Sequence, residues 1–311
     1  VRVAVTTGNT SLQEEDDRSF MSIWEKIIHD LKTNDGGTQF TTGQNYEYAL
    51  KSFRKIMGYD AITGFNISVA EIQKWKDGMK HGVKGKDGKL IGKISDTTAG
   101  IYLRACRAVW NTCVREGFLK DVPYPFSNKK EKGLVSIPPS AKRRKCYLRV
   151  CQMTELYNLF ISKQYPEHWG ESYTASVHFS LGLFLVQYLC NGFNMADAAR
   201  LKYDNYYFQN EGKAFRFNRK KTEKTSANGS EVIIPIIEPL QRILDEIAAP
   251  PTRDGYVFPQ IFNGAETEED RRKRTQQENK NVRERMDNVC HEVLQWDESI
   301  KPSGTWCRHS F

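Results

Sequence analysis

The sequence predicts a mainly α-helical protein with one small β-sheet, divided into two domains. Apolar residues recur at spacings of three and four over long stretches, which is the pattern of helices with one buried face. Two short apolar runs, at 214–218 and 231–236, flank a basic turn and are typical of paired strands. A polar and basic stretch at 127–145 lies between two helical regions and favours a domain boundary, acting as a basic linker.

The first domain is expected to be a helical bundle over 19–126, preceded by a flexible segment at 1–18. Its helices should begin near residues 19, 42, 68 and 95, where polar or turn residues precede the apolar periodicity. Ser68 followed by Glu71 predicts a capping box at the third helix. The fourth and longest helix should reach about Glu116, where Gly117 would supply its C-cap.

The longest helix combines a wide apolar stripe with a basic side. The apolar stripe comprises Tyr102, Leu103, Cys106, Val109, Trp110, Cys113 and Val114. The basic side comprises Arg104, Arg107, Asn111 and Arg115, at offsets of three, four and seven residues. Two interpretations stay open at this point. The basic side is either a solvated charged surface or a surface that contacts the backbone or a groove of DNA.

The second domain, 146–311, is expected to combine helices with the two strands. The predicted helices lie at about 152–163, 172–190, 239–250 and 278–294. Residues 264–275 mix acidic and basic side chains and are expected to be exposed. Because the sequence lacks an initiator Met and stops directly after the segment SGTWCRHSF, we expect it to be part of a longer chain with an incomplete C-terminus.

Composition narrows the range of functions. The chain has 46 Lys and Arg against 38 Asp and Glu, a net charge of +8, which favours a polyanionic partner. Seven cysteines without a CxxC pair argue against a disulfide framework or a zinc site, so we expect a reducing compartment, the cytoplasm, and no metal. The longest apolar run, Leu181 to Cys190, is interrupted by Gln187 and falls short of the ~20 residues that span a bilayer.

Two motifs in the second domain resemble those of a known family. Between Gly192 and Leu201 the residues resemble the pattern G-x-R-x-x-[DE]-x-x-x-L, with Asn194 at the position of R, and Lys221-Thr222 lies in the basic turn between the two strands. Residues 305–311 resemble a second pattern, H-x-x-R-H-x-[FA]. Both patterns are similar to those of the tyrosine recombinases, or phage-type integrases, including those of conjugative transposons. The positions that correspond are Gly192, Asn194, Asp197, Leu201, Lys221, Thr222, Thr305, Arg308 and His309.

The first domain is similar to the SAM-like core-binding domain of the same family. Its final long helix reads TTAGIYLRACRAVWNTCVREGFL and is followed by Pro125-Phe126, as is common in that domain. The resemblance implies an N-terminal helical core-binding domain followed by an α+β catalytic domain. The family's nucleophilic tyrosine lies C-terminal to the second motif, so none of the fourteen tyrosines of this chain occupies its position.

The resemblance implies site-specific cutting and rejoining of DNA through a 3′-phosphotyrosyl intermediate, during integration or excision of a mobile element. This transesterification uses neither a metal nor a nucleotide cofactor. Cationic groups must surround the phosphate as charge develops, which suits Arg308 and Lys221. Asp197 would orient neighbouring cations, Thr305 would donate a hydrogen bond, and His309 is a further active-site candidate.

Two positions depart from the family pattern, because Asn194 replaces the first arginine and Thr305 stands where histidine is frequent. Another cation must then contact the cut phosphate in an active enzyme. Arg200 is one candidate, but it lies six residues beyond Asn194. Arg219 is favoured, because alternate residues of a strand share a face and Arg219 would lie beside Lys221.

The resemblance also implies the partners. The main partner is double-stranded DNA, bound by a monomer that forms a homotetramer on recombining sites, with an accessory DNA-bending factor and a place at the nucleoid. The expected DNA-binding residues are Arg104, Arg107, Asn111, Arg115, Lys142, Arg143, Arg144 and Lys224. Two other interpretations stay open. One is a DNA-binding protein that has lost catalysis, and the other is a basic helical scaffold or RNA-binding protein, although no aromatic pattern of an RNA module is present.

Overall fold

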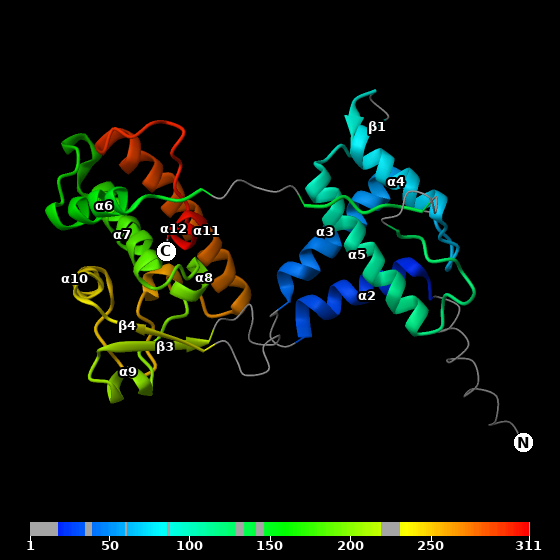
Figure 1. The fold of residues 1–311 in the computed structure, drawn as a ribbon. Helices are drawn as coiled ribbons and strands as arrows, with labels where there is room; N and C mark the ends of the chain where they lie inside the picture. Colours follow the sequence, from blue (N-terminus) through cyan, green and yellow to red (C-terminus); the bar gives the residue numbers. More distant parts are fainter. Residues whose placement is uncertain are drawn as a thin grey trace, which may run out of the picture. The chain divides into compact units, whose positions relative to one another are not determined.

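The computed structural model describes residues 18–34, 39–59, 61–85, 88–127, 134–140, 146–218 and 231–310. Internal contacts divide the chain into two compact units, 1–143 and 144–311, each with its own hydrophobic core (Figure 1). The described residues are mainly helical and form two small antiparallel sheets. The sequence predicted the sheet of the second unit but not that of the first.

The first unit is a bundle of four long helices with one two-residue β-ladder. Its elements are α2 (Phe20–Thr33), α3 (Phe40–Met57), α4 (Val69–His81), β1 (Val83–Lys84), β2 (Leu90–Ile91) and α5 (Asp96–Arg115). Ser19, Ser68 and Ser95 cap the starts of α2, α4 and α5 through their hydroxyl groups. The predicted capping box between Ser68 and Glu71 is confirmed.

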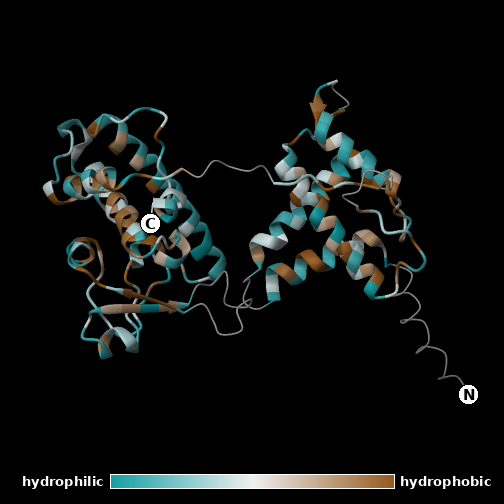
Figure 2. Ribbon diagram, viewed as in Figure 1, coloured by the Kyte–Doolittle hydropathy of each residue, from teal (hydrophilic) through white to brown (hydrophobic). Residues whose placement is uncertain are grey.

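Aromatic side chains hold this bundle together. Trp24 of α2, Phe53 of α3 and Trp75 of α4 pack against one another, with ring centroids 5.3 to 6.3 Å apart. Phe20 lies 6.3 Å from Trp110 of α5 and so ties the last helix to the first. All five side chains are almost completely buried. Figure 2 shows hydrophobic and hydrophilic stretches alternating along these helices. Such aromatic pairs contribute about 0.5–1.5 kcal/mol each beyond simple burial.

The end of α5 follows the predicted glycine stop, with one correction. Gly117 has a φ of +80°, and the amides of Gly117 and Phe118 bond back to the carbonyls of Val114 and Cys113. This is a Schellman motif, which satisfies the last carbonyls of the helix. Val114 was placed in the apolar stripe, yet it is 47% exposed, whereas Trp110 and Cys113 of the same stripe are buried. Val114 lies seven residues after the exposed Arg107 and therefore on the same side of the helix.

Residues 134–140 lie in the N-terminal unit, although the sequence assigned them to the linker. Val135 is fully buried beside Phe126, with which it forms an isolated parallel bridge. Lys76 of α4 donates a hydrogen bond to the hydroxyl of Ser136 at 3.0 Å. The carbonyl of Pro138 lies so close to Gly100 of α5 that a Cβ atom at Gly100 would be 2.5 Å from it. The segment is therefore packed against two helices of the unit.

The second unit is built around α7 (Gly170–Leu189), which is buried along most of its C-terminal half. Helices α6, α10, α11 and α12 all contact α7. Gly182 allows the closest approach, because a Cβ atom there would lie 2.7 Å from Ile247 and 3.0 Å from Phe160. The other elements are α6 (Val150–Ser162), α8 (Met195–Ala198), α9 (Asn205–Gln209), β3 (Ala214–Asn218), β4 (Glu231–Pro235), α10 (Glu238–Ile247), α11 (Glu268–Asn288) and α12 (Gly304–Ser310).

Strands β3 and β4 form the predicted antiparallel pair, with Phe215 opposite Ile234. Both of these side chains are fully buried, whereas Arg216 and Ile233 form an exposed pair on the other face. The alternation is that of a sheet with one buried and one solvated face. The segment that joins the two strands, 219–230, lies outside the described residues.

Helix α11 begins ten residues earlier than predicted. The sequence suggested an exposed segment at 264–275 and a helix from 278, whereas the structure has one continuous helix from Glu268. Thr267 caps it by accepting a hydrogen bond from the amide of Asp270 at 3.1 Å. The first half of α11 has almost no buried apolar residue, so periodicity could not reveal it. The three acidic residues in its first turn favour the helix by interacting with the dipole.

Candidate functional site

The two motifs of the second unit meet at Gly192 and Arg308. The Nε–H of Arg308, on α12, donates a hydrogen bond to the carbonyl oxygen of Gly192 at 2.9 Å. Gly192 has a φ of +66°, which favours glycine, and a Cβ atom there would lie only 2.6 Å from the Cα atom of Arg308. The glycine is thus required both by its backbone conformation and by the close approach of α12.

Asn194 caps the start of α8 and forms a reciprocal pair with Asp197. The Oδ1 atom of Asn194 accepts from the amide of Asp197 at 2.9 Å, and Oδ2 of Asp197 accepts from the amide of Asn194 at 3.2 Å. Asp197 is 6% exposed, so this carboxylate is fixed within the unit. The Asn194 side chain is therefore an uncharged helix cap, two residues after the glycine that holds Arg308.

Helix α12 is anchored by buried contacts around Arg308. Cys307 is fully buried, and its thiol donates to the carbonyl of Phe184 on α7 at 3.4 Å. Burial strongly raises the pKa of this thiol, so it is a packing residue rather than a nucleophile. Ser310 accepts a hydrogen bond from the amide of Leu148 at 2.7 Å. Arg308 and Thr305 themselves are exposed, and His309 is half-buried.

Gln187 lies beneath the start of α12. Its side chain is fully buried, and neither amide atom has a hydrogen-bond partner among the described residues. A Cβ atom at Gly304 would lie 2.9 Å from Oε1 of Gln187, so the amide packs directly against this glycine. A buried polar group without a partner costs about 1–3 kcal/mol. The unpaired amide of Gln187 therefore makes the contact between α7 and α12 less stable.

The β-hairpin is attached to the same segment. The ring of Phe217 on β3 lies 5.8 Å from that of Phe193, the residue between Gly192 and Asn194. The predicted catalytic residues of the hairpin, Lys221 and Arg219, lie outside the described residues, as do Thr222, Lys224, Lys142, Arg143 and Arg144. The structure therefore brings Gly192, Asn194, Asp197 and Arg308 into one region and gives no position for the lysine.

Arg200, the other candidate for the missing cation, has its own partners. Its Nη2 atom pairs with Glu268 of α11 at 3.0 Å, and its guanidinium lies 5.9 Å from the ring centre of Phe262. These contacts hold the side chain toward α11.

The basic side of α5 is exposed in the first unit. Arg107, Asn111 and Arg115 are exposed, and Arg104 is half-buried beside Gly100. None of the three arginines forms an ion pair with a carboxylate among the residues that the structure describes. Arg115 donates to the hydroxyl of Thr112, at 3.4 Å. Unneutralised charges on one helix side can contact a polyanion at little electrostatic cost.

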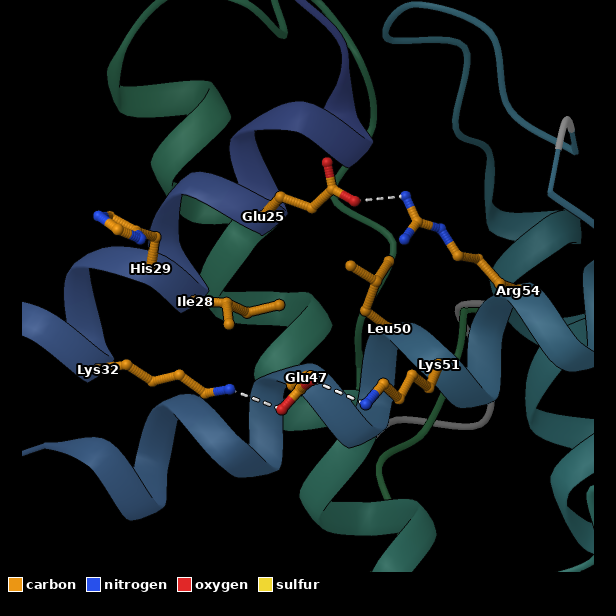
Figure 3. A pocket seen from close by; sticks show the side chains of 8 residues that line it. All are labelled: Glu25, Ile28, His29, Lys32, Glu47, Leu50, Lys51 and Arg54. Atoms are coloured by element: carbon orange, nitrogen blue, oxygen red, sulfur yellow. Dashed lines mark hydrogen bonds and ion pairs between the residues drawn. The ribbon is translucent and has the colours of Figure 1, made fainter. Parts of the chain in front are cut away.

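A hollow of about 350 Å³ lies between α2 and α3 (Figure 3). Its charged side chains already pair with one another: Glu47 accepts from Lys32 at 2.6 Å and pairs with Lys51 at 2.7 Å. The hydrogen bond from Lys32 is the largest cause that lowers the pKa of Glu47. Arg54 pairs with Glu25 at 2.7 Å. The imidazole of His29 also lines the hollow and takes no part in these pairs (Figure 3). With most of its charges already paired, the hollow carries no functional assignment.

A hydrogen-bonded chain of side chains in the second unit was not predicted from the sequence. The hydroxyl of Tyr165 lies 2.8 Å from Nδ1 of His178, and Nε2 of His178 lies 3.0 Å from Glu246, which also pairs with Lys163. Burial lowers the pKa of His178 and raises that of Tyr165. The residues come from α7, α10 and the loop after α6, so no local motif indicates them. Phe160 of α6 stacks on the imidazole at 4.2 Å, and the chain thereby joins three helices.

The described part of the chain has neither a metal cluster nor a membrane span. No group of three or more His, Cys, Asp or Glu residues converges there in a way that could hold a metal ion. Within the same ranges, every helix is too short or too polar to cross a membrane.

Comparison with known proteins gives one match. Residues 19–132 match the family model of the phage integrase SAM-like domain, a range that includes helices α2 to α5 of the first unit. This finding supports the predicted resemblance of residues 19–126 to the SAM-like domain of the integrases. Neither the curated proteins nor the solved structures contain a significant match to the chain.

The close approach at Gly192 generates a prediction. Replacing Gly192→Ala should destabilise the second unit by about 2–4 kcal/mol, because it adds a clash with Arg308 to the strain of a left-handed alanine. Gly264→Ala is the matched control: its φ is +76° but nothing lies within 4 Å, so only about 1–2 kcal/mol of strain is expected.

Thermal unfolding and amide hydrogen exchange over residues 304–310 check this expectation. Exchange of the α12 amides should accelerate in the Gly192 variant and remain unchanged in the Gly264 variant. Equal effects of both substitutions would contradict the docking of Arg308 on Gly192.

Proposed function

We propose that the protein is a site-specific DNA recombinase of the tyrosine type, which cuts and rejoins DNA through a 3′-phosphotyrosyl intermediate during integration or excision of a mobile element. The observation that carries the proposal is the docking of Arg308 on Gly192, beside the Asn194–Asp197 pair. The phage integrase SAM-like match over 19–132 supports it independently, from the other unit. The catalytic residues and the chemistry are part of the proposal.

Arg308 would bind the phosphate that is cut. The Nε–H donates to the Gly192 carbonyl and fixes the plane of an otherwise exposed guanidinium. The two terminal nitrogens would then face the non-bridging oxygens with a geometry that suits phosphate. Loss of a preorganised donor of this kind typically costs about 100- to 1,000-fold in rate.

Arg219 would supply the charge that Asn194 lacks. On β3, Phe215 is buried and Phe217 packs on Phe193, whereas Arg216 points to the exposed face. If this alternation continues past Asn218, Arg219 and Lys221 lie on the side of the two phenylalanines. Lys221 would then follow the leaving oxygen, and Arg219 would contact the same phosphate. Asp197 would orient the neighbouring cations.

The proposed partner is duplex DNA, bound by a free monomer that assembles into a homotetramer on recombining sites with an accessory bending factor. A DNA-binding protein without catalysis is the second candidate. It is favoured by one specific observation: the Asn194 side chain is committed to capping α8 and carries no charge.

A cleavage assay separates these two candidates. The complete gene product would be incubated with a nicked suicide duplex, and the covalent protein–DNA complex would be measured. Arg219→Ala and Arg308→Ala should each lower its formation about 100-fold or more, with DNA affinity nearly unchanged. Asn194→Arg should partly restore the Arg219→Ala variant.

Arg216→Ala is the matched control, because it removes an arginine from the exposed face of β3. Normal cleavage by Arg219→Ala would contradict the assignment of Arg219. No covalent complex with the unaltered protein on its own recombining site would favour the second candidate.

DNA binding should depend on the basic side of α5. Arg104→Ala together with Arg107→Ala should weaken duplex binding and reduce the salt dependence by about 0.9 in log–log slope for each phosphate that the variant no longer neutralises. Lys26→Ala with Lys55→Ala removes the same charge from exposed positions of α2 and α3 and serves as the control. Fluorescence anisotropy at several salt concentrations measures both. Equal affinities of the two double variants would show that the α5 arginines form a solvated surface and do not contact DNA.

A further inference from the structure

Three cations gather around two aromatic rings between α8 and α11. Arg200 follows α8, Lys202 pairs with Tyr256 in an isolated antiparallel bridge, and Arg271 lies in the first turns of α11. We call Arg200, Lys202 and Arg271 the cation cluster. None of them belongs to the site at Arg308 described above.

The distances show a compact arrangement. The Nζ atom of Lys202 lies 4.8 Å from the ring centre of Tyr256, and the guanidinium carbon of Arg271 lies 5.8 Å from it. The same carbon of Arg271 is 5.6 Å from the ring centre of Phe262, over which Arg200 also lies, at 5.9 Å. Rings attract cations through their quadrupole and hold them without neutralising their charge.

One carboxylate bridges the two arginines. The Oε2 atom of Glu268 lies 3.0 Å from Arg200, and Oε1 lies 3.4 Å from Arg271. The neighbouring acids Glu269 and Asp270 pair with Lys273, at 2.9 and 3.8 Å. Three cations around one bridging carboxylate leave an excess of positive charge.

The guanidinium groups are held by the backbone as well. The Nε–H of Arg271 donates to the carbonyl of Ala265 at 3.0 Å, and Nη1 of Arg200 lies 3.5 Å from that of Ala196. Two oriented guanidinium groups that share a carboxylate can instead share a phosphate, which also presents paired oxygens.

We propose that the cation cluster binds a phosphate of the DNA backbone, separate from the phosphate at the cutting site, and that Glu268 occupies the two arginines until DNA replaces it. The inference rests on the proposed function. A duplex fits better than a small anion, because Lys202 and Glu268 are exposed on an open surface and the cations are spread over two rings.

Two substitutions with opposite expected signs test this site. Lys202→Ala should weaken duplex binding about fivefold to tenfold and lower its log–log salt slope by about 0.9, the value for one phosphate. Glu268→Gln should tighten binding severalfold, because it frees both arginines while keeping the side-chain shape. Glu171→Gln, an exposed carboxylate in the first turn of the 20-residue helix α7, is the control for a general change of net charge.

Anisotropy with a fluorescent duplex gives the affinities, and circular dichroism confirms that each variant is folded. If the unaltered protein does not bind duplex DNA, the proposed function itself fails. If it binds with strong salt dependence while Lys202→Ala and Glu268→Gln bind as the unaltered protein does, only the cation cluster is refuted. Equal tightening by Glu268→Gln and Glu171→Gln also refutes it, since net charge alone would explain the effect.

Inorganic phosphate separates the two sources of the anion. In calorimetry, Glu268→Gln should show at most weak phosphate binding, because one phosphate uses only part of the cluster. If Glu268→Gln bound free phosphate tightly but bound DNA no better than the unaltered protein does, the assignment of the cluster to DNA would be overturned.

Discussion

The second unit depends on the contact between Gly192 and Arg308. The approach of α12 to the end of α7 is possible only because residue 192 has no side chain, and the carbonyl oxygen of this residue then fixes the guanidinium. Two sequence segments more than a hundred residues apart become one site through this single contact. A cation fixed by its own Nε–H keeps its terminal nitrogens in a defined plane, which is what phosphate recognition requires.

Some residues around the contact between Gly192 and Arg308 stabilise it, and one destabilises it. Cys307 holds α12 against the carbonyl of Phe184 on α7. On the other side of the contact, Phe193, which follows Gly192, packs against Phe217 of β3. Gln187, in contrast, is buried beneath Gly304 without a partner among the described residues. An unpaired buried amide costs about 1–3 kcal/mol, so the contact between α7 and α12 is less stable than the contact at Gly192.

Much of the helical framework could be predicted from the sequence. Ser19, Ser68 and Ser95 indicated helix starts because their hydroxyl groups cap free amides, and Gly117 indicated a stop. The early start of α11 could not be predicted, since its first turns bury almost nothing and carry no periodic signal. The burial of Val135 could not be predicted either, because in a polar, basic stretch it depends on tertiary packing alone.

The site could be predicted only in part. The sequence placed Gly192, Asn194 and Asp197 in one motif, but it did not reveal that Asn194 and Asp197 would cap each other at the start of α8. The cation cluster could not be predicted, because Arg200 and Arg271 are distant in sequence and meet only through Glu268 and Phe262. The positions of Lys221 and Arg219 remain predictions.

The most direct test of the Arg308–Gly192 site is the nuclear magnetic resonance signal of the Arg308 Nε–H, assigned by its loss in Arg308→Lys. We expect a resolved signal in the free protein, because this group donates to the Gly192 carbonyl, and a shift that grows with duplex DNA and disappears at high salt. An Arg308 signal that stays unchanged while the signal of Arg107 shifts would show that DNA binds without reaching the site. That result would contradict the proposal that Arg308 binds the phosphate that is cut.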